Sequence, residues 1–210
     1  MGDREPAFPD PETRNRLASD CERCPALVDC RERITWGNGP RDAEVMVVGE
    51  APGAGDPGAE RWRGGNWTGL AYTSRHSGRR VRRLLADVGH PDAYYTNAVK
   101  CFPGDGAGSN REPTAEERAN CRPYLREEVE TVDPRVVVPT GKHATKSVLA
   151  LEGKSIEGFL DHVLEPVDCP DLGVRVVPVL HPSYQEVWLP EVEHTAASYR
   201  AAIADLLAER

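Results

Sequence analysis

Residues 43–53 read AEVMVVGEAPG, an apolar run that ends at a glycine, an acid and a proline-containing turn. A short, continuous apolar run of this kind predicts a strand buried on both faces, as in a parallel sheet. Three later runs of similar character end in turns rich in glycine, proline or polar residues. The four expected strands are residues 43–48, 93–99, 135–138 and 174–180.

Helix-like segments, with apolar residues at helical spacing, lie between and after these runs. We expect helices at residues 79–88, from 114 to about 129, at 142–151 and at 195–207. Thr114 and Glu117 form a capping-box pattern at the start of the second helix. Strands that alternate with helices predict a three-layer α/β fold with a central four-stranded, mostly parallel sheet flanked by helices. The 210 residues suffice for one domain, which we assign to residues 21–210 after a lead-in segment at 1–20.

The overall charge argues against a nucleic-acid partner, because 34 acidic against 26 basic residues give a net charge of −8. A local basic stripe can still bind phosphate groups. One candidate stripe opens the first expected helix and consists of Arg75, His76, Arg79, Arg80, Arg82 and Arg83. A solvated helix face is the alternative interpretation. The sequence has no apolar run of membrane length and no secretory signal pattern, so we expect a cytoplasmic monomer without a membrane partner.

Polar side chains follow three of the four expected strands. Glu50 comes after the first strand, Asn97 lies at the end of the second, and His181 follows the fourth. Because ligands bind outside the carboxyl ends of strands in open α/β sheets, we expect these side chains at one rim. An asparagine suits the amide edge of a planar heterocycle, and a histidine can donate to an oxygen on which charge develops.

The segment at residues 51–77 is long and rich in glycine, and it carries Trp62, Trp67 and Tyr72. A loop of this length in a compact domain is usually either functional or disordered. Three large aromatic residues favour a functional loop.

Six cysteines are many for a chain without an export signal and indicate a metal or redox site. Four of them form a candidate ligand set, with Cys21 and Cys24 in a CxxC pattern and Cys101 and Cys121 further along. Four thiolates can hold a zinc ion or a [4Fe–4S] cluster, and the spacing leans only slightly towards the cluster. We interpret Cys30 as structural and Cys169 as incidental.

Taken together, these motifs resemble those of the iron–sulfur (type 4) uracil-DNA glycosylases over residues 21–207. The motifs, in chain order, are Cys21-Glu22-Arg23-Cys24, Gly49-Glu50-Ala51-Pro52-Gly53, Thr96-Asn97-Ala98-Val99-Lys100-Cys101, Cys121-Arg122-Pro123 and His181-Pro182-Ser183. The resemblance implies a DNA repair enzyme that flips uracil out of DNA, hydrolyses its N-glycosidic bond and leaves an abasic site. It also implies a structural [4Fe–4S] cluster on the four cysteines of the candidate set.

The resemblance assigns roles to individual residues. Glu50 and His181 are the implied catalytic residues, with Glu50 near the attacked sugar carbon and His181 facing uracil O2. The implied uracil pocket is formed by Gly49, Ala51, Gly53, Asn97 and a stacking aromatic residue. The family has a phenylalanine as this aromatic in a Pro-Phe-Val-Gly stretch, which residues 67–78 replace here. Tyr72 is our first candidate for the stacking residue and Trp67 the second.

DNA contacts are expected from Arg79 and Arg80 on phosphates, and from Ser183 and Tyr184 as a wedge in the duplex. The altered loop at residues 67–78 leaves open a related glycosylase with shifted or broader base specificity. A non-catalytic iron–sulfur or zinc module that binds nucleic acid is a second alternative. A nucleotide-binding α/β enzyme is disfavoured, because the sequence has neither a GxGxxG nor a GxxxxGK[ST] pattern.

Overall fold

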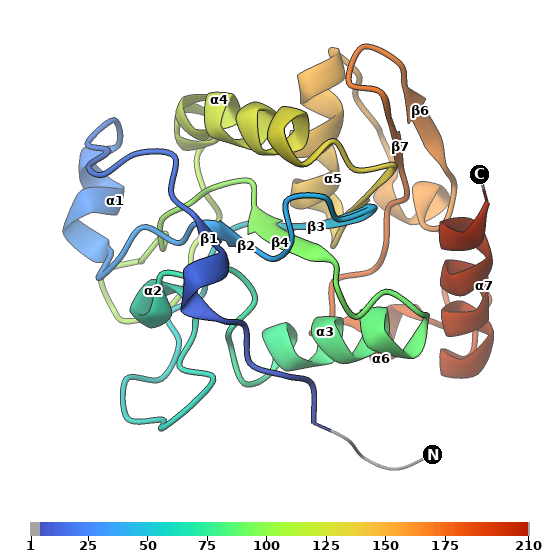
Figure 1. Ribbon diagram of the computed structural model, residues 1–210, viewed down its shortest axis with the longest axis horizontal. Helices are drawn as coiled ribbons and strands as arrows, with labels where there is room; N and C mark the ends of the chain where they lie inside the picture. The colour runs from blue at the N-terminus through green and yellow to red at the C-terminus, as the bar shows by residue number, and fades with distance from the viewer. Residues whose placement is uncertain (1–4, 210) are drawn as a thin grey trace.

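Seven strands form one mixed sheet at the centre of the protein in a computed structural model that describes residues 5–209 (Figure 1). The order across the sheet is β1-β2-β4-β3-β5-β7-β6. The strands are β1 (Arg14–Asn15), β2 (Gly37–Asn38), β3 (Val45–Gly49), β4 (Tyr94–Asn97), β5 (Val136–Pro139), β6 (Val167–Cys169) and β7 (Val174–Val176).

The four central strands, β4, β3, β5 and β7, pair in parallel. They fall on the four apolar runs of the sequence, so the predicted α/β class is confirmed. The expected number of four strands is too low, because β1, β2 and β6 extend the sheet in antiparallel pairings. β1 and β2 have two residues each and join the sheet through backbone pairing, which leaves no apolar pattern in the sequence.

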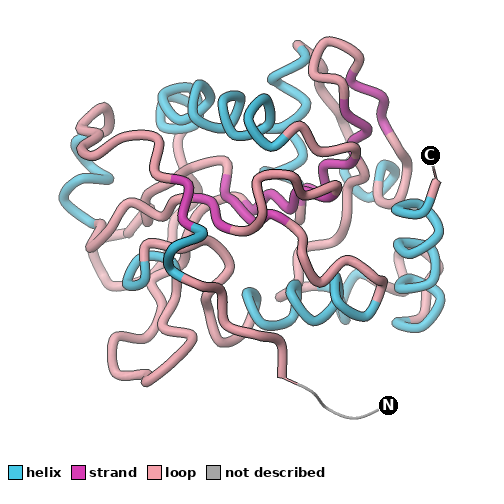
Figure 2. The backbone as a smooth tube through the Cα atoms, viewed as in Figure 1, coloured by secondary structure: helices cyan, strands magenta, loops and turns pink. Residues whose placement is uncertain are grey.

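Helices cover both faces of the sheet (Figures 1 and 2). The helices are α1 (Pro25–Cys30), α2 (Gly65–Thr68), α3 (Ser77–Asp87), α4 (Ala115–Val132), α5 (Lys142–Leu149), α6 (Gln185–Trp188) and α7 (Ala196–Ala208). Short 3₁₀ turns lie at Pro11–Thr13, Ala150–Glu152 and Phe159–His162. Helices α4 and α5 contribute to the core on one face, and α3 and α7 to the core on the other.

Strand β3 shows how one apolar run serves both cores. Met46 and Val48 pack in the core beneath α4 and α5, whereas Val45 and Val47 pack in the core beneath α3 and α7. Successive side chains of a strand point to opposite faces of the sheet, so a strand covered on both sides needs apolar residues at every position.

The four expected helices correspond to α3, α4, α5 and α7. The capping box at α4 is present, with Thr114 accepting from Glu117 N and the Glu117 side chain accepting from Thr114 N. The segment at residues 51–77 holds α2 and isolated bridges from Trp36 to Leu70 and from Arg63 to Ser74.

Strand β1 lies within the segment that the sequence assigned to a lead-in, and the division at residue 20 stays a prediction. Across residues 5–209, no helix has the length and hydrophobicity that a membrane crossing requires.

A buried ion pair ties β4 to α4. Lys100 Nζ lies 2.5 Å from Glu128 Oε2, and their side chains are 2% and 0% exposed. Lys100 also donates to the Thr96 hydroxyl (2.7 Å) and to the backbone oxygen of Asn97 (2.6 Å). Glu128 accepts from Gly37 N and from the Tyr94 and Thr96 hydroxyls. Every donor and acceptor of the pair therefore has a partner, as a buried charge requires.

Replacing Lys100 with methionine should lower the free energy of unfolding by about 3–5 kcal/mol, because Glu128 would be left as an uncompensated buried charge. Urea denaturation measures this loss. The exposed Lys146, changed to methionine, is the matched control and should shift stability by less than about 0.5 kcal/mol.

The double variant Lys100→Met/Glu128→Gln should be more stable than Lys100→Met alone, since glutamine keeps an acceptor for Gly37 N and Tyr94 without the charge. A double variant no more stable than Lys100→Met would contradict the assignment of the loss to the unpaired carboxylate.

Candidate active site

A cleft of about 1240 Å³ opens at the carboxyl ends of the parallel strands. The turns after β3, β4 and β5 and the segment after β7 all contribute to its lining. Of the residues predicted for the site, the cleft is lined by Gly49, Glu50, Ala51, Gly53, Tyr72, Asn97, His181, Ser183 and Tyr184. The structure thus brings together every predicted catalytic and pocket residue.

The floor of the cleft is formed by Gly49, Asn97 and Tyr72. A Cβ atom added at Gly49 would lie 2.4 Å from Asn97 Oδ1 and 2.9 Å from the Tyr72 hydroxyl oxygen. Backbone hydrogen bonds from Ala98 N to Gly49 O (2.7 Å) and from Val99 N to Glu50 O (2.9 Å) join the two turns. Only a glycine at position 49 leaves room for the amide and the phenol where they lie.

Tyr72 holds its place in a left-handed backbone conformation, with φ of +53°. Such a conformation costs a non-glycine residue about 1–2 kcal/mol, so surrounding contacts must fix it. Its hydroxyl bonds the Thr140 hydroxyl at 2.7 Å. Trp67 does not line the cleft, and its indole N–H donates to Ala54 O at 2.8 Å.

Arg82 is the main contact that fixes Tyr72. Its guanidinium donates to Tyr72 O (3.0 Å), Ala71 O (3.1 Å) and Asn38 Oδ1 (2.6 Å), and lies 3.9 Å from the ring centre of Tyr95. Burial lowers the pKa of Arg82 to about 10. The sequence placed Arg82 in a basic stripe for phosphate. That expectation is wrong for this residue, which is buried among carbonyl oxygens and an aromatic ring.

The hydrogen bond of His181 selects one tautomer of its ring. Ser183 N donates to His181 Nδ1 at 3.2 Å, so the neutral ring carries its proton on Nε2. Burial lowers the pKa of His181, which favours this neutral form. His181 thus presents an N–H donor at the cleft.

Glu50 lies opposite two residues that sequence reasoning missed. Its Oε1 atom is buried and has no hydrogen-bond partner among the described residues. His143, near the start of α5, has Nδ1 at 3.9 Å from that atom and Nε2 at 3.1 Å from Glu112 Oε1. Burial raises the pKa of Glu50, and the interaction with His143 partly opposes this increase. His143 could have been found from its position, because it is a polar residue shortly after β5, the third parallel strand.

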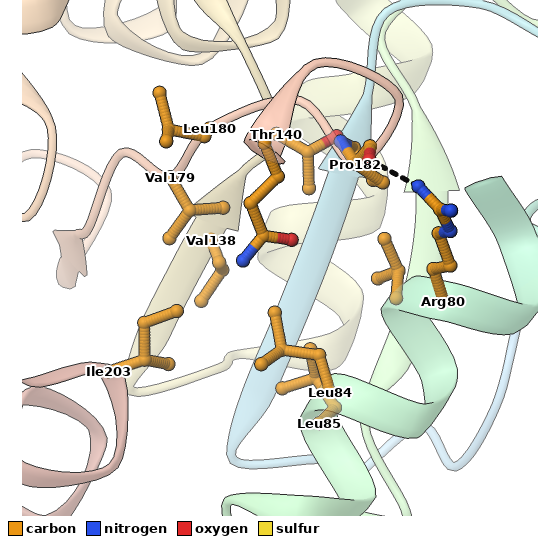
Figure 3. Close-up of a pocket in the computed structure, with 11 residues that line it drawn as sticks. Arg80, Leu84, Leu85, Val138, Thr140, Val179, Leu180, Pro182 and Ile203 are labelled. Atoms are coloured by element: carbon orange, nitrogen blue, oxygen red, sulfur yellow. Dashed lines mark hydrogen bonds between the residues drawn. The ribbon is translucent and has the colours of Figure 1, made fainter. Parts of the chain in front are cut away.

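Arg79 and Arg80, predicted to contact phosphates, lie outside the cleft lining and have partners in the protein. Arg79 pairs with Glu5 at 3.3 Å. Arg80 donates to Pro182 O at 3.3 Å and lies 3.7 Å from Glu186. Figure 3 shows this bond above a small apolar pocket lined in part by Leu84, Leu85, Val138 and Val179. Arg80 thus holds the segment that carries His181.

Large exposed hydrophobic side chains gather on the segment after His181. Tyr184, Val187 and Trp188 are 58%, 65% and 40% exposed. All three lie at or within α6, and Tyr184 and Trp188 also line the cleft. The sequence pointed to Tyr184 but not to the two residues beside it.

The predicted ligand cysteines come from the segment before α1, the segment after β4 and the first half of α4. Cys101 and Cys121 pack with Leu27 and Val99 in a separate small core, against which Cys24 packs. Burial raises the pKa of the Cys101 thiol, and electrostatic interactions with Cys21 and Cys24 add to this shift. Burial likewise raises the pKa of the Cys121 thiol, to about 11, and electrostatic interactions with Cys101 and Cys24 add to this shift.

Two side chains donate hydrogen bonds to these sulfur atoms. Arg31 donates to Cys101 Sγ (3.3 Å), and Asn120 to Cys24 Sγ (3.4 Å). Cys30 and Cys169 lie outside this group. Within the described part of the chain, no three His, Cys, Asp or Glu side chains are grouped so as to hold a metal ion.

The fold and the cleft place the protein in the class of α/β proteins that bind a ligand at the carboxyl ends of parallel strands. A carboxylate, a carboxamide and a neutral imidazole meet at the carboxyl ends of parallel strands, where α/β proteins bind small planar ligands.

Comparison with known proteins gives the family. The profile of the Uracil DNA glycosylase superfamily matches residues 36–207. A type-5 uracil-DNA glycosylase of Pyrobaculum aerophilum is 36% identical, with 91% of each chain covered. A type-4 uracil-DNA glycosylase of Thermotoga maritima is 32% identical over 78% of this chain and 77% of the relative. The chain belongs to the uracil-DNA glycosylase superfamily, which confirms the family resemblance of the motifs, with relatives of both types.

Replacing Arg82 with methionine should lower the free energy of unfolding by about 3 kcal/mol, because three oxygen atoms lose a charged donor. Arg82→Lys should recover little of this loss, since a lysine lacks the planar fork that reaches all three acceptors. Urea denaturation of both variants measures the effect.

The exposed Arg200 on α7 provides the control as Arg200→Met. A stability of Arg82→Met equal to that of the control would contradict the structural role of this guanidinium.

Proposed function

We propose that this protein is a DNA repair glycosylase that hydrolyses the N-glycosidic bond of uracil in DNA and leaves an abasic site. Membership of the superfamily and the names of its relatives support this activity. The observation that carries the proposal is the cleft floor, where Gly49 leaves room for Asn97 and Tyr72 beside it.

Asn97 would distinguish uracil from cytosine by the direction of its hydrogen bonds. Uracil offers a donor at N3 and an acceptor at O4, which match the oxygen and the nitrogen of an amide side chain. Cytosine offers an acceptor at N3 and a donor at N4, so a fixed amide leaves two pairs of like groups facing each other. Such unpaired polar groups in a dry pocket are strongly unfavourable.

Tyr72 is favoured over Trp67 as the aromatic wall of the pocket, because it lines the cleft beside Gly49 and Asn97. Ala51 and Gly53 line the same cleft next to Glu50 and complete the uracil-binding set that we propose.

His181 and Glu50 would act on opposite ends of the breaking bond. Cleavage leaves negative charge on uracil and positive charge on the sugar. The Nε2–H of His181 can stabilise the charge that develops on uracil O2. The Glu50 carboxylate can stabilise the sugar cation or accept a proton from the attacking water.

Binding would require the base to leave the duplex, at a cost of a few kcal/mol. Ser183 and Tyr184, joined by the exposed Val187 and Trp188, would fill the gap left in the stack. Arg80 would support this segment through Pro182, and contacts of Arg79 and Arg80 with phosphates stay a prediction.

Cys21, Cys24, Cys101 and Cys121 would hold a [4Fe–4S] cluster. Cys24 packs against Cys101 and Cys121, and Arg31 and Asn120 donate to two of these sulfur atoms, which supports such a group. When bound, the cluster would link the chain before α1 to β4 and α4 and would serve a structural purpose. A cytoplasmic monomer remains our expectation for the protein as a whole.

The activity is tested with labelled DNA strands that carry one uracil, thymine, hypoxanthine or xanthine, followed by alkaline cleavage at abasic sites. We expect release of uracil by the wild-type protein. Gly49→Ala should reduce the rate by about 100-fold, because its Cβ displaces Asn97 and Tyr72 by a large part of an ångström.

Gly58→Ala is the control, since its Cβ meets only Asp56 Oδ1 at 3.4 Å. Release of another base in place of uracil would favour the alternative of shifted specificity. No release from any strand, by a protein that binds DNA, would contradict the proposed activity and favour a non-catalytic module.

The cluster is tested by iron, sulfide and zinc analysis of the purified protein. We expect iron and sulfide in equal amounts, with loss of both in Cys101→Ala and Cys121→Ala. Cys169→Ala should retain them, because Cys169 lies at the opposite edge of the sheet in β6. One zinc ion per chain in place of iron would contradict the proposed cluster.

A further inference from the structure

Three side chains from separate segments meet at one end of the cleft. Glu50 follows β3, Glu112 precedes α4, and His143 lies near the start of α5. All three line the cleft. The imidazole lies between the carboxylates, 3.1 Å from Glu112 Oε1 on one side and 3.9 Å from Glu50 Oε1 on the other.

The two distances have different meanings. A separation of 3.1 Å is short enough for a direct polar contact, so Glu112 can fix the orientation of the ring through Nε2. A separation of 3.9 Å is too long for a hydrogen bond to Glu50. However, one water molecule can hydrogen-bond to both atoms at once, so that its oxygen and the two atoms form a triangle.

Glu50 Oε1 needs such a partner. The atom is buried and accepts no hydrogen bond from the described residues. A buried polar atom without a partner is rare and calls for an explanation, of which bound water is a common one. His143 Nδ1, at 3.9 Å, is a polar neighbour of this oxygen atom.

We propose that His143, oriented by Glu112, shares with Glu50 the task of holding the water molecule that attacks the sugar. This inference rests on the proposed function and adds a third catalytic side chain to Glu50 and His181. Glu112 acts through His143 and is a positioning residue.

The reaction step is a hydrolysis. The C1′–N1 bond breaks and its electron pair leaves with uracil, while the water oxygen forms the new bond to C1′. One water proton passes to the Glu50 carboxylate, which then releases it to solvent, and the uracil anion takes up one proton from solvent. The net change is the addition of one water molecule across the bond.

The charges around Glu50 give this arrangement a signature in the pH dependence of the reaction. Burial raises the pKa of Glu50, His143 and Arg118 lower it, and Glu112 raises it. Because the carboxylate form accepts the proton, the rate rises with pH as Glu50 ionises. Loss of His143 should therefore shift the acidic limb of the rate profile to higher pH. Loss of the Glu112 charge should shift this limb to lower pH.

The experiment measures single-turnover uracil release across the acid and neutral pH range for wild type, His143→Ala, His143→Gln and Glu112→Gln. We expect both His143 variants to lose about 10- to 100-fold in maximal rate, as expected for a misplaced reactant. Affinity for uracil-containing DNA should stay unchanged. Glu112→Gln keeps an oxygen beside His143 and should retain more of the rate.

His90→Gln is the matched control, because His90 lies just after α3, outside the cleft lining. Melting temperatures show whether each variant folds, and His143→Gln replaces His143→Ala if the alanine variant does not. Opposite shifts of the acidic limb in the His143 and Glu112 variants would support the proposal, since a purely structural role does not produce them.

An unchanged rate and pH profile in folded His143 variants would overturn this inference and leave the proposed function intact. Shifts in the same direction for both residues would also overturn it. A wild-type protein that releases no uracil would overturn the proposed function and this inference with it.

Discussion

The buried ion pair of Lys100 and Glu128 connects several parts of the structure. Lys100 follows the end of β4, and Glu128 lies on α4, so the pair joins the central sheet to one covering layer. The same ammonium binds the backbone oxygen of Asn97. The next residue along the chain is Cys101, in the small core that also holds Cys121 from α4. One buried charge pair thus sets the relative positions of the sheet, the cleft and the cysteine group.

The short segment that follows β4 explains why cleft and cysteine group occur together. Ala98 and Val99 donate backbone hydrogen bonds to Gly49 O and Glu50 O, which brings the turn after β3 against the turn after β4. Asn97 lines the cleft, whereas Cys101, four residues later, packs in the small core. A displacement of this segment would therefore disturb the proposed uracil pocket and the proposed cluster at once. A structural cluster bound to the cysteines would hold this segment, and with it the proposed pocket, in place.

The central strands and the polar residues at their ends could be predicted from the sequence, because both depend on which residues are buried. The four central strands carry apolar residues at successive positions because helices cover both faces, and the polar residues at their ends meet because parallel strands share one carboxyl edge. The edge strands β1 and β2 depend on backbone pairing, which no residue pattern records. His143 and Glu112 belong to none of the motifs that indicated the site, so their role could not be predicted from those motifs. Arg82 was misassigned by charge, although it shares the spacing of Gly78, Val81 and Leu85, the buried face of α3.

Two buried cations hold the two sides of the cleft floor in the same way. Lys100 donates to the backbone oxygen of Asn97 at 2.6 Å, and Arg82 donates to that of Tyr72 at 3.0 Å. Neither cation needs the substrate as a partner, since each already has acceptors within the protein. Reading a base by the direction of its hydrogen bonds requires an amide that cannot turn to suit cytosine, and a ring that cannot retreat. A charged donor on the backbone oxygen fixes the main chain from which each of these side chains reaches the cleft. Arg82, which sequence reasoning placed in a basic stripe for phosphate, thus lies inside the protein and helps to hold the cleft floor in place.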